Sequence, residues 1–220
     1  MQKKLLIIGG GGFAKEVFEI AQLNGYSIHG CLDDKEDISI KCNYLGKISN
    51  LESISDNFDA AFVAIGAYDS QSLSKRISII KLVSGLGIKM ATLISPHAII
   101  SSGVEIKNGC FIAHGVVICV DAKIKDNVIV NANAVIGHDS LVKNNCIIAP
   151  SAFIGGSTSI GENSFIGPCS QILQGLSLGK QTLVSSGALV KRSIPDNTSV
   201  FAQRSKIFES WIKNYFIYLK

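Results

Sequence analysis

One histidine of the chain is followed directly by an aspartate, and this pair could move a proton. In His138-Asp139 the carboxylate can hold one imidazole nitrogen, which leaves the other nitrogen as a neutral proton acceptor. Gly156 stands eighteen residues further on and could donate its backbone N–H to a carbonyl oxygen. A base beside such a donor is the minimum for acyl transfer to an amine or a hydroxyl group. A surface histidine without a catalytic role is the alternative.

A second candidate site lies near the start of the chain, in a glycine-rich turn between a predicted strand and a predicted helix. Free N–H groups and the helix dipole favour a phosphate at such a turn. Asp33 and Asp34 follow about twenty residues later, where a carboxylate can bind a ribose hydroxyl or a base N–H. A tight turn and a capped loop are the structural alternative. The turn spans Gly9–Lys15.

The element that positions His138 follows from a six-residue repeat. Every sixth residue from Ile94 to Val190 is aliphatic, which fits neither the helical nor the strand period. The residue two positions earlier is usually small, and turn-forming residues come after each aliphatic position. This pattern predicts a triangular prism of a little over five coils, with three short strands and eighteen residues in each coil. Gly156 should then lie directly above His138.

The first ninety residues have the pattern of a Rossmann-like unit. Predicted buried strands alternate there with predicted amphipathic helices, which is typical of a βαβ half of a doubly wound fold. The glycine turn and the two aspartates should therefore meet at one edge of the sheet, where ligands of such folds bind. The expected strands are 4–8, 27–32 and 60–65, the last ending at Gly66, and the expected helices are 13–24 and 71–86.

The chain therefore combines an α/β unit with a β-solenoid. We expect a Rossmann-like domain at 1–90, a hexapeptide-repeat domain at 91–195, and a C-terminal tail at 196–220 that contains a short aromatic helix. A helix docked on the protein is the favoured interpretation of that tail, and contact with a membrane surface is the alternative.

A metal site is the main competitor for the histidine chemistry, and we expect none. Carbonic anhydrases with a prism fold bind zinc through three histidines. Here His114 and His138 are twenty-four residues apart, which places them on different corners of the prism, and no third histidine is in register with either. Cys110 and Cys146 fall on the small inward position of the repeat, so we interpret them as packing residues.

Composition limits the partners of the protein. The chain has 220 residues, 47% of them hydrophobic, six cysteines and a formal net charge of +4, which is enough for two compact units. No Lys/Arg cluster with interleaved aromatics is present, so we expect no nucleic acid. No apolar run reaches eighteen residues, and the N-terminal pattern is that of a first strand, so we expect a cytoplasmic protein without membrane insertion.

Together these motifs resemble the sialic acid O-acetyltransferase (NeuD) family. This family includes the bacterial N-acetyltransferases that act on nucleotide-linked 4-amino-4,6-dideoxy sugars, among them PglD and the perosamine and dTDP-4-amino-4,6-dideoxyglucose N-acetyltransferases. The resemblance covers residues 1 to about 203. It rests on Ile7–Lys15, Cys31–Asp34, Val63–Gly66, Ile94–Ala98, Asn131–Asp139 and Gly187–Val190.

The resemblance implies a left-handed parallel β-helix and a homotrimer with active sites at subunit interfaces. It implies acetyl-CoA as co-substrate, no metal, and N-acetylation of a UDP-, dTDP- or GDP-linked 4-amino sugar for surface glycans such as the O-antigen of lipopolysaccharide. His138 would be the general base, Asp139 its orienting partner, and Gly156 the donor to the acetyl carbonyl. The implied lining of the pantetheine arm is Gly167, Ser185, Ser186 and Gly187. The implied nucleotide-sugar contacts are Gly10, Gly11, Gly12, Phe13, Asp33, Asp34 and Gly66.

The chain departs from the family pattern in three places, and two other functions stay open. Phe13 stands where many relatives have a histidine, Ala67–Ser70 replaces a stretch that often contains Asn or Arg, and Phe201–Lys206 replaces a closing G-x-P-A-K motif. The first alternative is O-acetylation of a sugar similar to sialic acid, for which the same base would serve. The second is a prism that binds or scaffolds without catalysis.

Overall fold

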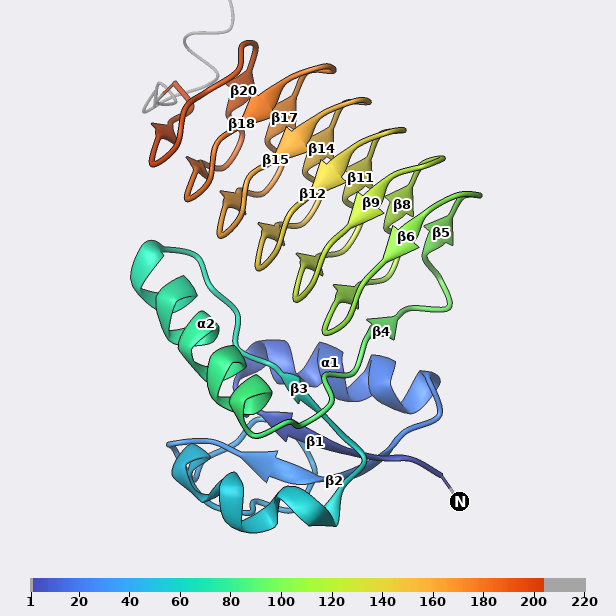
Figure 1. Ribbon diagram of the computed structural model, residues 1–220, viewed down its shortest axis with the longest axis vertical. Helices are drawn as coiled ribbons and strands as arrows, with labels where there is room; N and C mark the ends of the chain where they lie inside the picture. The colour runs from blue at the N-terminus through green and yellow to red at the C-terminus, as the bar shows by residue number, and fades with distance from the viewer. Residues whose placement is uncertain (1, 204–220) are drawn as a thin grey trace, which may run out of the picture.

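The computed structural model describes residues 2–203, in which an α/β layer lies beneath a stack of triangular coils (Figure 1). The expected aromatic helix at 205–220 lies outside the described residues. Among the described helices, none is long and apolar enough to cross a membrane.

The lower layer is the predicted βαβ unit. Its three strands are parallel and follow the order β2-β1-β3. The predicted strands and helices are confirmed, except that the third strand ends two residues early and the helices begin and end one residue early. The elements are β1 (Lys4–Ile8), α1 (Gly12–Leu23), β2 (Ser27–Leu32), the 3-10 helices η1 (Ile48–Asn50) and η2 (Glu52–Asn57), β3 (Ala60–Val63) and α2 (Ser70–Gly85).

Alternation along β1 divides this layer into two cores. Leu5 and Ile7 pack with α1 toward the prism, whereas Leu6 and Ile8 pack with α2 and η1 on the other side of the sheet. Both faces of the short sheet are therefore covered, as a parallel sheet requires. Figure 1 shows α1 between the sheet and the lowest coil, and α2 rising beside the lower coils.

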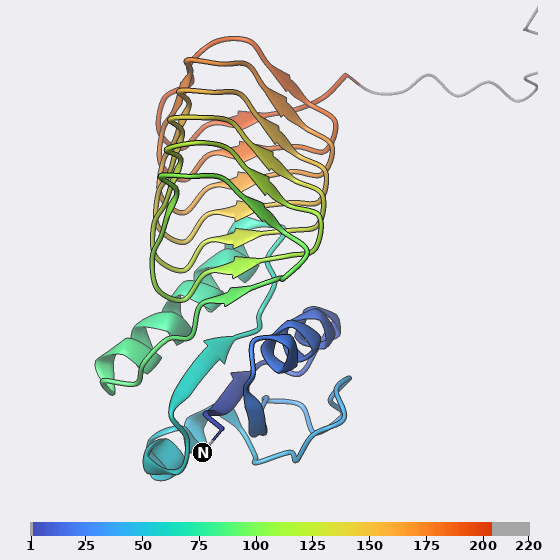
Figure 2. The ribbon, with the colours of Figure 1, turned by 90° about the vertical axis from the view of Figure 1, so that its right-hand side faces the viewer.

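The prism consists of two-residue strands. They form three sheets of parallel strands, one on each side of the prism (Figure 2). We name its sides by what lies outside them. The docked face faces the α/β layer and holds β4 (Leu93–Ile94), β7 (Phe111–Ile112), β10 (Ile129–Val130), β13 (Ile147–Ile148), β16 (Phe165–Ile166), β19 (Leu183–Val184) and β21 (Ser199–Val200). The apolar face holds β5 (Ile99–Ile100), β8 (Val117–Ile118), β11 (Val135–Ile136), β14 (Phe153–Ile154), β17 (Gln171–Ile172) and β20 (Leu189–Val190). The polar face holds β6 (Glu105–Ile106), β9 (Lys123–Ile124), β12 (Leu141–Val142), β15 (Ser159–Ile160) and β18 (Ser177–Leu178).

Three rows of turns join these faces. The first corner leads from the docked to the apolar face, as at residues 149–152; the second leads from the apolar to the polar face, as at 137–140; the third returns to the docked face, as at 143–146. Many corners carry a residue with positive φ, usually Asn, Asp or Gly, because the left-handed region suits short polar side chains and glycine.

The predicted eighteen-residue register is confirmed by the strand pairing. Val135 pairs with Val117 below and with Phe153 above. The aliphatic residues of the six-residue repeat, which we call the ladder, point inward and are buried from Ile112 to Val190. Ile100 in the lowest coil is 38% exposed because no coil lies beneath it. Stacking therefore supplies the core of the prism.

The prism is longer than the regular ladder predicts. Leu178 bridges Ile194, and Val184 pairs with Val200, so the last coil is two residues shorter than the others. This shortening places Val200 in register where counting by six from Val190 does not, and it brings the stack to about six coils.

A cluster of aromatic rings joins the two layers. The ring of Phe13 lies edge-on to Phe111 of β7 in the second coil, with centroids 5.0 Å apart, and Phe62 of β3 lies 6.0 Å from the same ring. Such contacts stabilise an interface beyond their buried area. On the docked face the outward residues Phe111, Ile129 and Ile147 are at most 3% exposed, so the α/β layer covers this lower part of the face.

We expect the ladder to dominate stability. Ile148 is fully buried, so Ile148→Ala should lower the free energy of unfolding by about 2–5 kcal/mol, because it removes apolar contacts and leaves a cavity. Lys123→Ala on the polar face removes only an exposed ion pair with Glu105 and should change it by less than about 0.5 kcal/mol. Urea unfolding followed by circular dichroism at one protein concentration measures both. Equal losses would contradict stacking as the source of stability.

Candidate active site

His138 and Asp139 form a hydrogen-bonded pair at the second corner. The imidazole Nδ1 lies 2.7 Å from Asp139 Oδ2. Because an ionised carboxylate can only accept, the proton sits on Nδ1 and the lone pair of Nε2 is free. Asp139 has a φ of 57°, and the two side chains are 62% and 59% exposed. The ring is therefore held in one tautomer, with its basic nitrogen open to a substrate.

Gly156 lies over the ring of His138, as the repeat predicted. A Cβ atom added to Gly156 would lie 2.5 Å from His138 Nε2. Hydrogen bonds hold the residues on both sides of Gly156 to the adjacent coils. Ser157 N–H donates to the carbonyl of His138 at 2.7 Å, and Gly155 N–H donates to the carbonyl of Ile172. The Gly156 N–H makes no hydrogen bond within the part of the chain that the structure describes. A base and an unused backbone donor thus lie side by side.

The glycine turn divides into a buried and an open half. Gly10 is buried, its N–H donates to Asp33 Oδ2 at 2.6 Å, and its carbonyl accepts from Ser39 N–H. The N–H of Gly10, which we expected to contact a nucleotide, is therefore already hydrogen-bonded inside the protein. Gly11 and Gly12 are exposed, with open space around them.

The start of α1 offers unused donors beside this open half. Gly11 is the N-cap, no side chain caps the helix, and its first turn has no acidic residue. The first N–H groups of a helix have no intrahelical partner and carry the positive end of the dipole. These groups suit an anion such as a phosphate.

The two aspartates have different surroundings. Asp33 uses both carboxylate oxygens inside the protein, accepting from Gly10 N–H and from Lys35 N–H at 2.8 Å. Asp34 points outward and lies 3.4 Å from Lys75 Nζ, with both side chains more than half exposed. Asp34 is therefore the acid available to a ligand, and Asp33 holds the turn. The sequence offers no signal for Lys75, which α2 brings to the same edge.

Phe13 and Gly66 line a cleft of about 270 Å³ between the α/β layer and the prism. Its far wall is the docked face, and its rim includes Asn131, Pro150 and Pro168 of the first corner. Asn131 uses its amide N–H to bond the carbonyl of Ile148 at 3.1 Å. Glu16 of α1 is a further polar residue of the cleft. Sequence reasoning did not find the cleft, because its walls come from elements that only tertiary packing brings together.

The remaining predicted residues lie away from His138. Gly167 follows β16, and Ser185, Ser186 and Gly187 follow β19, so all four stand at the first corner, whereas His138 stands at the second. Within one chain, the structure brings Gly156 to His138 and Gly66 to Phe13, but it separates these two groups.

Other polar clusters have structural partners. His114 Nδ1 lies 2.6 Å from Ser95 Oγ, and its Nε2 lies 3.8 Å from Glu19 of α1. Within residues 2–203, no group of three His, Cys, Asp or Glu side chains could hold a metal ion. Burial raises the pKa of both Cys110 and Cys146 to about 12, which suits packing residues.

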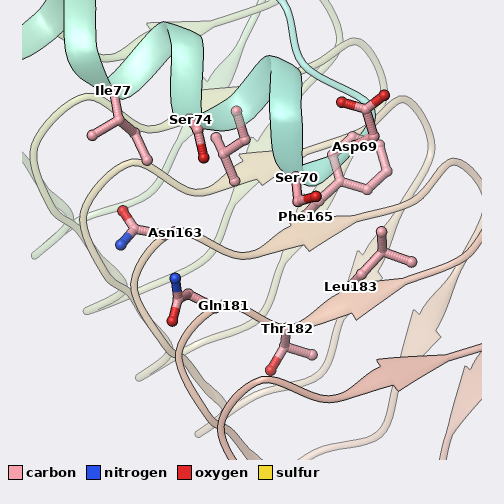
Figure 3. A pocket seen from close by; sticks show the side chains of 10 residues that line it. Asp69, Ser70, Ser74, Ile77, Asn163, Phe165, Gln181, Thr182 and Leu183 are labelled. Atoms are coloured by element: carbon pink, nitrogen blue, oxygen red, sulfur yellow. The ribbon is translucent and has the colours of Figure 1, made fainter.

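A second cavity, of about 110 Å³, lies at the third corner beside the start of α2 (Figure 3). Asn163 and Gln181 come from the corner, and Ser70 and Asp69 come from the helix. Asp69 caps α2 by accepting from Ser72 N–H at 2.8 Å, and the hydrogen bonds from Ser72 lower the pKa of its carboxyl. This cavity lies at a different corner from His138 and takes no part in the site.

Comparison with known proteins matches both halves of the chain. Residues 4–75 match the family described as PglD N-terminal domain, and residues 121–156 match the bacterial transferase hexapeptide of six repeats. Curated protein sequences gave no match. The acetyltransferase domain of PglB from Neisseria gonorrhoeae is 33% identical with a TM-score of 0.84, and the alignment covers 91% of this chain and 97% of that one.

This chain belongs to the family of hexapeptide-repeat sugar acyltransferases with a PglD-type N-terminal domain. The same PglB domain has been solved with acetyl coenzyme A. Perosamine N-acetyltransferase from Caulobacter crescentus, as a His-to-Asn mutant with CoA and GDP-perosamine, is 27% identical with a TM-score of 0.84 over 94% of this chain and 97% of that one. The protein is therefore an acyltransferase.

We expect Gly156 to tolerate no side chain. Gly156→Ala would place a methyl group against His138 Nε2, displacing the ring and lowering acyl transfer by roughly 10²-fold, with an unchanged circular dichroism spectrum. Gly85→Ala is the matched control, because an added Cβ there meets nothing within 4 Å. Release of thiol from an acyl-CoA measures both variants. Full activity of Gly156→Ala would remove Gly156 from the site.

Proposed function

We propose that this acyltransferase transfers the acetyl group of acetyl-CoA to the 4-amino group of a nucleotide-linked 4-amino-4,6-dideoxy sugar. The observation that carries the proposal is the free Nε2 of His138, fixed by Asp139, beside the unbonded N–H of Gly156. The relatives that bind acetyl coenzyme A, or CoA with GDP-perosamine, support this pair of substrates. The product would feed surface glycan synthesis from the cytoplasm.

His138 acts as the general base in this reaction. The amine attacks the thioester carbonyl carbon, and Nε2 accepts the proton that the amine gives up as the C–N bond forms. The Gly156 N–H donates to the carbonyl oxygen, on which negative charge develops. The C–S bond then breaks and CoA leaves as the thiolate. Asp139 keeps the imidazole in the required tautomer and stabilises its charge once it is protonated.

The open half of the glycine turn holds the nucleotide. The free N–H groups at the start of α1, around Gly11, Gly12 and Phe13, suit the phosphates. Asp34, at the carboxyl edge of the sheet, suits a ribose hydroxyl or a base N–H. The cleft beside Gly66 then receives the sugar, because it opens from the same turn.

We propose that the protein is a homotrimer, and the outward residues of the apolar face support this proposal. Its outward residues form one mostly apolar row in which Ile99, Phe153 and Leu189 are 62%, 43% and 46% exposed. The polar face instead carries Glu105 and Lys123, joined by an exposed ion pair. An exposed apolar row of this kind marks an interaction surface. Three copies that turn this face toward a common axis would cover it and close the ring.

Such a trimer would also complete the active site. The apolar face lies between the first and second corners, so packing around a three-fold axis brings the first corner of one copy to the second corner of the next. The cleft that would receive the sugar borders the first corner at Pro150 and Pro168, whereas His138 is at the second. In the trimer, His138 would face the sugar held by the neighbouring copy, and Gly167 and Ser185–Gly187 of that neighbour would line the pantetheine arm.

Activity assays test the chemistry. We expect thiol release from acetyl-CoA with at least one GDP-, UDP- or dTDP-linked 4-amino-4,6-dideoxy sugar, and a loss of about 10²- to 10⁴-fold in His138→Asn, which lacks the base. His114→Asn is the matched control and should keep its activity. Turnover with sialic acid or its CMP form alone would instead show an O-acetyltransferase. No turnover with any acceptor, or an unaffected His138→Asn, would favour a non-catalytic prism.

Light scattering on a sizing column tests the assembly. Phe153→Glu adds a charge to the apolar face and should convert the trimer to a monomer with little activity, because desolvating that carboxylate in an interface is costly. Ser159 lies in the same coil on the polar face, so Ser159→Glu is the matched control and should leave the trimer intact. A monomeric wild-type protein with full activity would contradict the shared site.

A further inference from the structure

One face of α1 borders the cleft between the α/β layer and the prism. Phe13 and Glu16 both line this cleft, because side chains three residues apart share one face of a helix. Phe13 brings a ring without a hydrogen-bonding group, and this ring packs edge-on against Phe111. Among the described residues that line the cleft, Glu16 alone carries a charge.

The rest of the lining is mostly apolar. Outward residues of the docked face, such as Ile147 and Phe165, make up one wall, and Pro150 and Pro168 lie at the rim. Asn131 is the other polar side chain, and its amide N–H already donates to a backbone carbonyl. A ligand in this cleft therefore meets apolar surface and one carboxylate.

The carboxylate of Glu16 has both oxygens available. Glu16 is exposed, and within residues 2–203 it makes no ion pair and no side-chain hydrogen bond. Glu19, one turn further along α1, instead lies 3.8 Å from Nε2 of His114. An ionised carboxylate can only accept, so Glu16 calls for hydrogen-bond donors on the ligand.

Three kinds of group on a nucleotide-linked amino sugar could meet Glu16. Phosphate would be repelled by its like charge. An ammonium group held beside a carboxylate would keep its proton and could not attack a thioester. Hydroxyl groups are left, and two of them on neighbouring carbons can donate to both carboxylate oxygens at once.

The position of Glu16 along α1 agrees with this assignment. It stands four residues after Gly12, near which lie the free N–H groups that suit a phosphate. Four residues of helix rise by about 6 Å, which is close to the width of one pyranose ring. Phosphates at the start of α1 and hydroxyls at Glu16 can therefore belong to one nucleotide sugar.

We propose that Glu16 selects an acceptor sugar with free hydroxyl groups at C2 and C3. This inference rests on the proposed function and narrows its substrate class. Both hydroxyls donate to the carboxylate, and the amine at C4 stays outside this pair of bonds, free to react. An acetamido group at C2 puts a bulkier amide in place of one hydroxyl and removes the paired donors.

Two 4-amino-4,6-dideoxy sugars on the same nucleotide, which differ only in a hydroxyl or an acetamido group at C2, test the selection. We expect the wild-type kcat/KM to be at least tenfold higher for the diol. Glu16→Ala should lower kcat/KM for the diol roughly 10- to 10²-fold, mainly through KM, because hydrogen bonds to a charged group are lost. The preference for the diol should disappear with them.

Glu19→Ala is the matched control, because Glu19 is a carboxylate of the same helix that does not line the cleft. It should keep both the rate and the preference. Equal wild-type rates on the two sugars, or an unaffected Glu16→Ala, would overturn the inference.

The pH dependence separates binding of hydroxyls from binding of the amine. If Glu16 held the ammonium group, Glu16→Gln would move the rising limb of kcat/KM to lower pH, because the amine would then lose its proton more readily. The preference at C2 would stay. That combination would overturn the inference, whereas we expect an unmoved limb and a lost preference.

Calorimetric titration of the same two sugars separates this inference from the proposed function. Tighter binding of the diol that Glu16→Ala weakens, without thiol release from acetyl-CoA, would sustain the selection and overturn the proposed reaction. Equal affinity for both sugars, with thiol release from acetyl-CoA, would overturn the selection and sustain the reaction. Binding of neither sugar would overturn both.

Discussion

The register between successive coils is the constraint on which the rest of this structure depends. Every strand of the prism satisfies its backbone groups only by pairing with the strands one coil below and one coil above, so each side chain has a fixed neighbour there. This pairing places Gly156 over the ring of His138. A free donor at Gly156 is possible because the residues on either side already bond the adjacent coils. Catalytic geometry in this protein is thus a product of stacking.

A triangular prism has three faces, and this chain gives each face a different outward surface. The docked face buries its apolar residues under the protein's own α/β layer, and Phe13 and Phe111 join the two. The polar face carries charge. Within residues 2–203 no segment covers the apolar face, and Phe153 is exposed there. The surfaces on the three faces therefore decide both where the N-terminal domain sits and where a second copy would bind.

In the N-terminal layer, neighbouring residues of the glycine turn and of the acidic pair have different roles. Gly10 and Asp33 are used to hold the turn closed, whereas Gly11, Gly12 and Asp34 remain outside. Both aspartates and all the glycines have the right residue type for a nucleotide site. The loop after β2 contributes to this division, because its Ser39 N–H donates to the carbonyl of Gly10 and its Ile38 side chain packs against Gly10. Local sequence does not contain that information.

The sequence by itself determined the period of the prism, the register of His138 with Gly156 and the strands and helices of the βαβ unit, because each depends on a periodicity or on a residue's neighbours along the chain. The cleft at Phe13, the ion pair of Asp34 with Lys75 and the shortened last coil were decided only by the tertiary structure. These features join segments far apart in the chain or break the repeat, and no local pattern encodes which surfaces then meet.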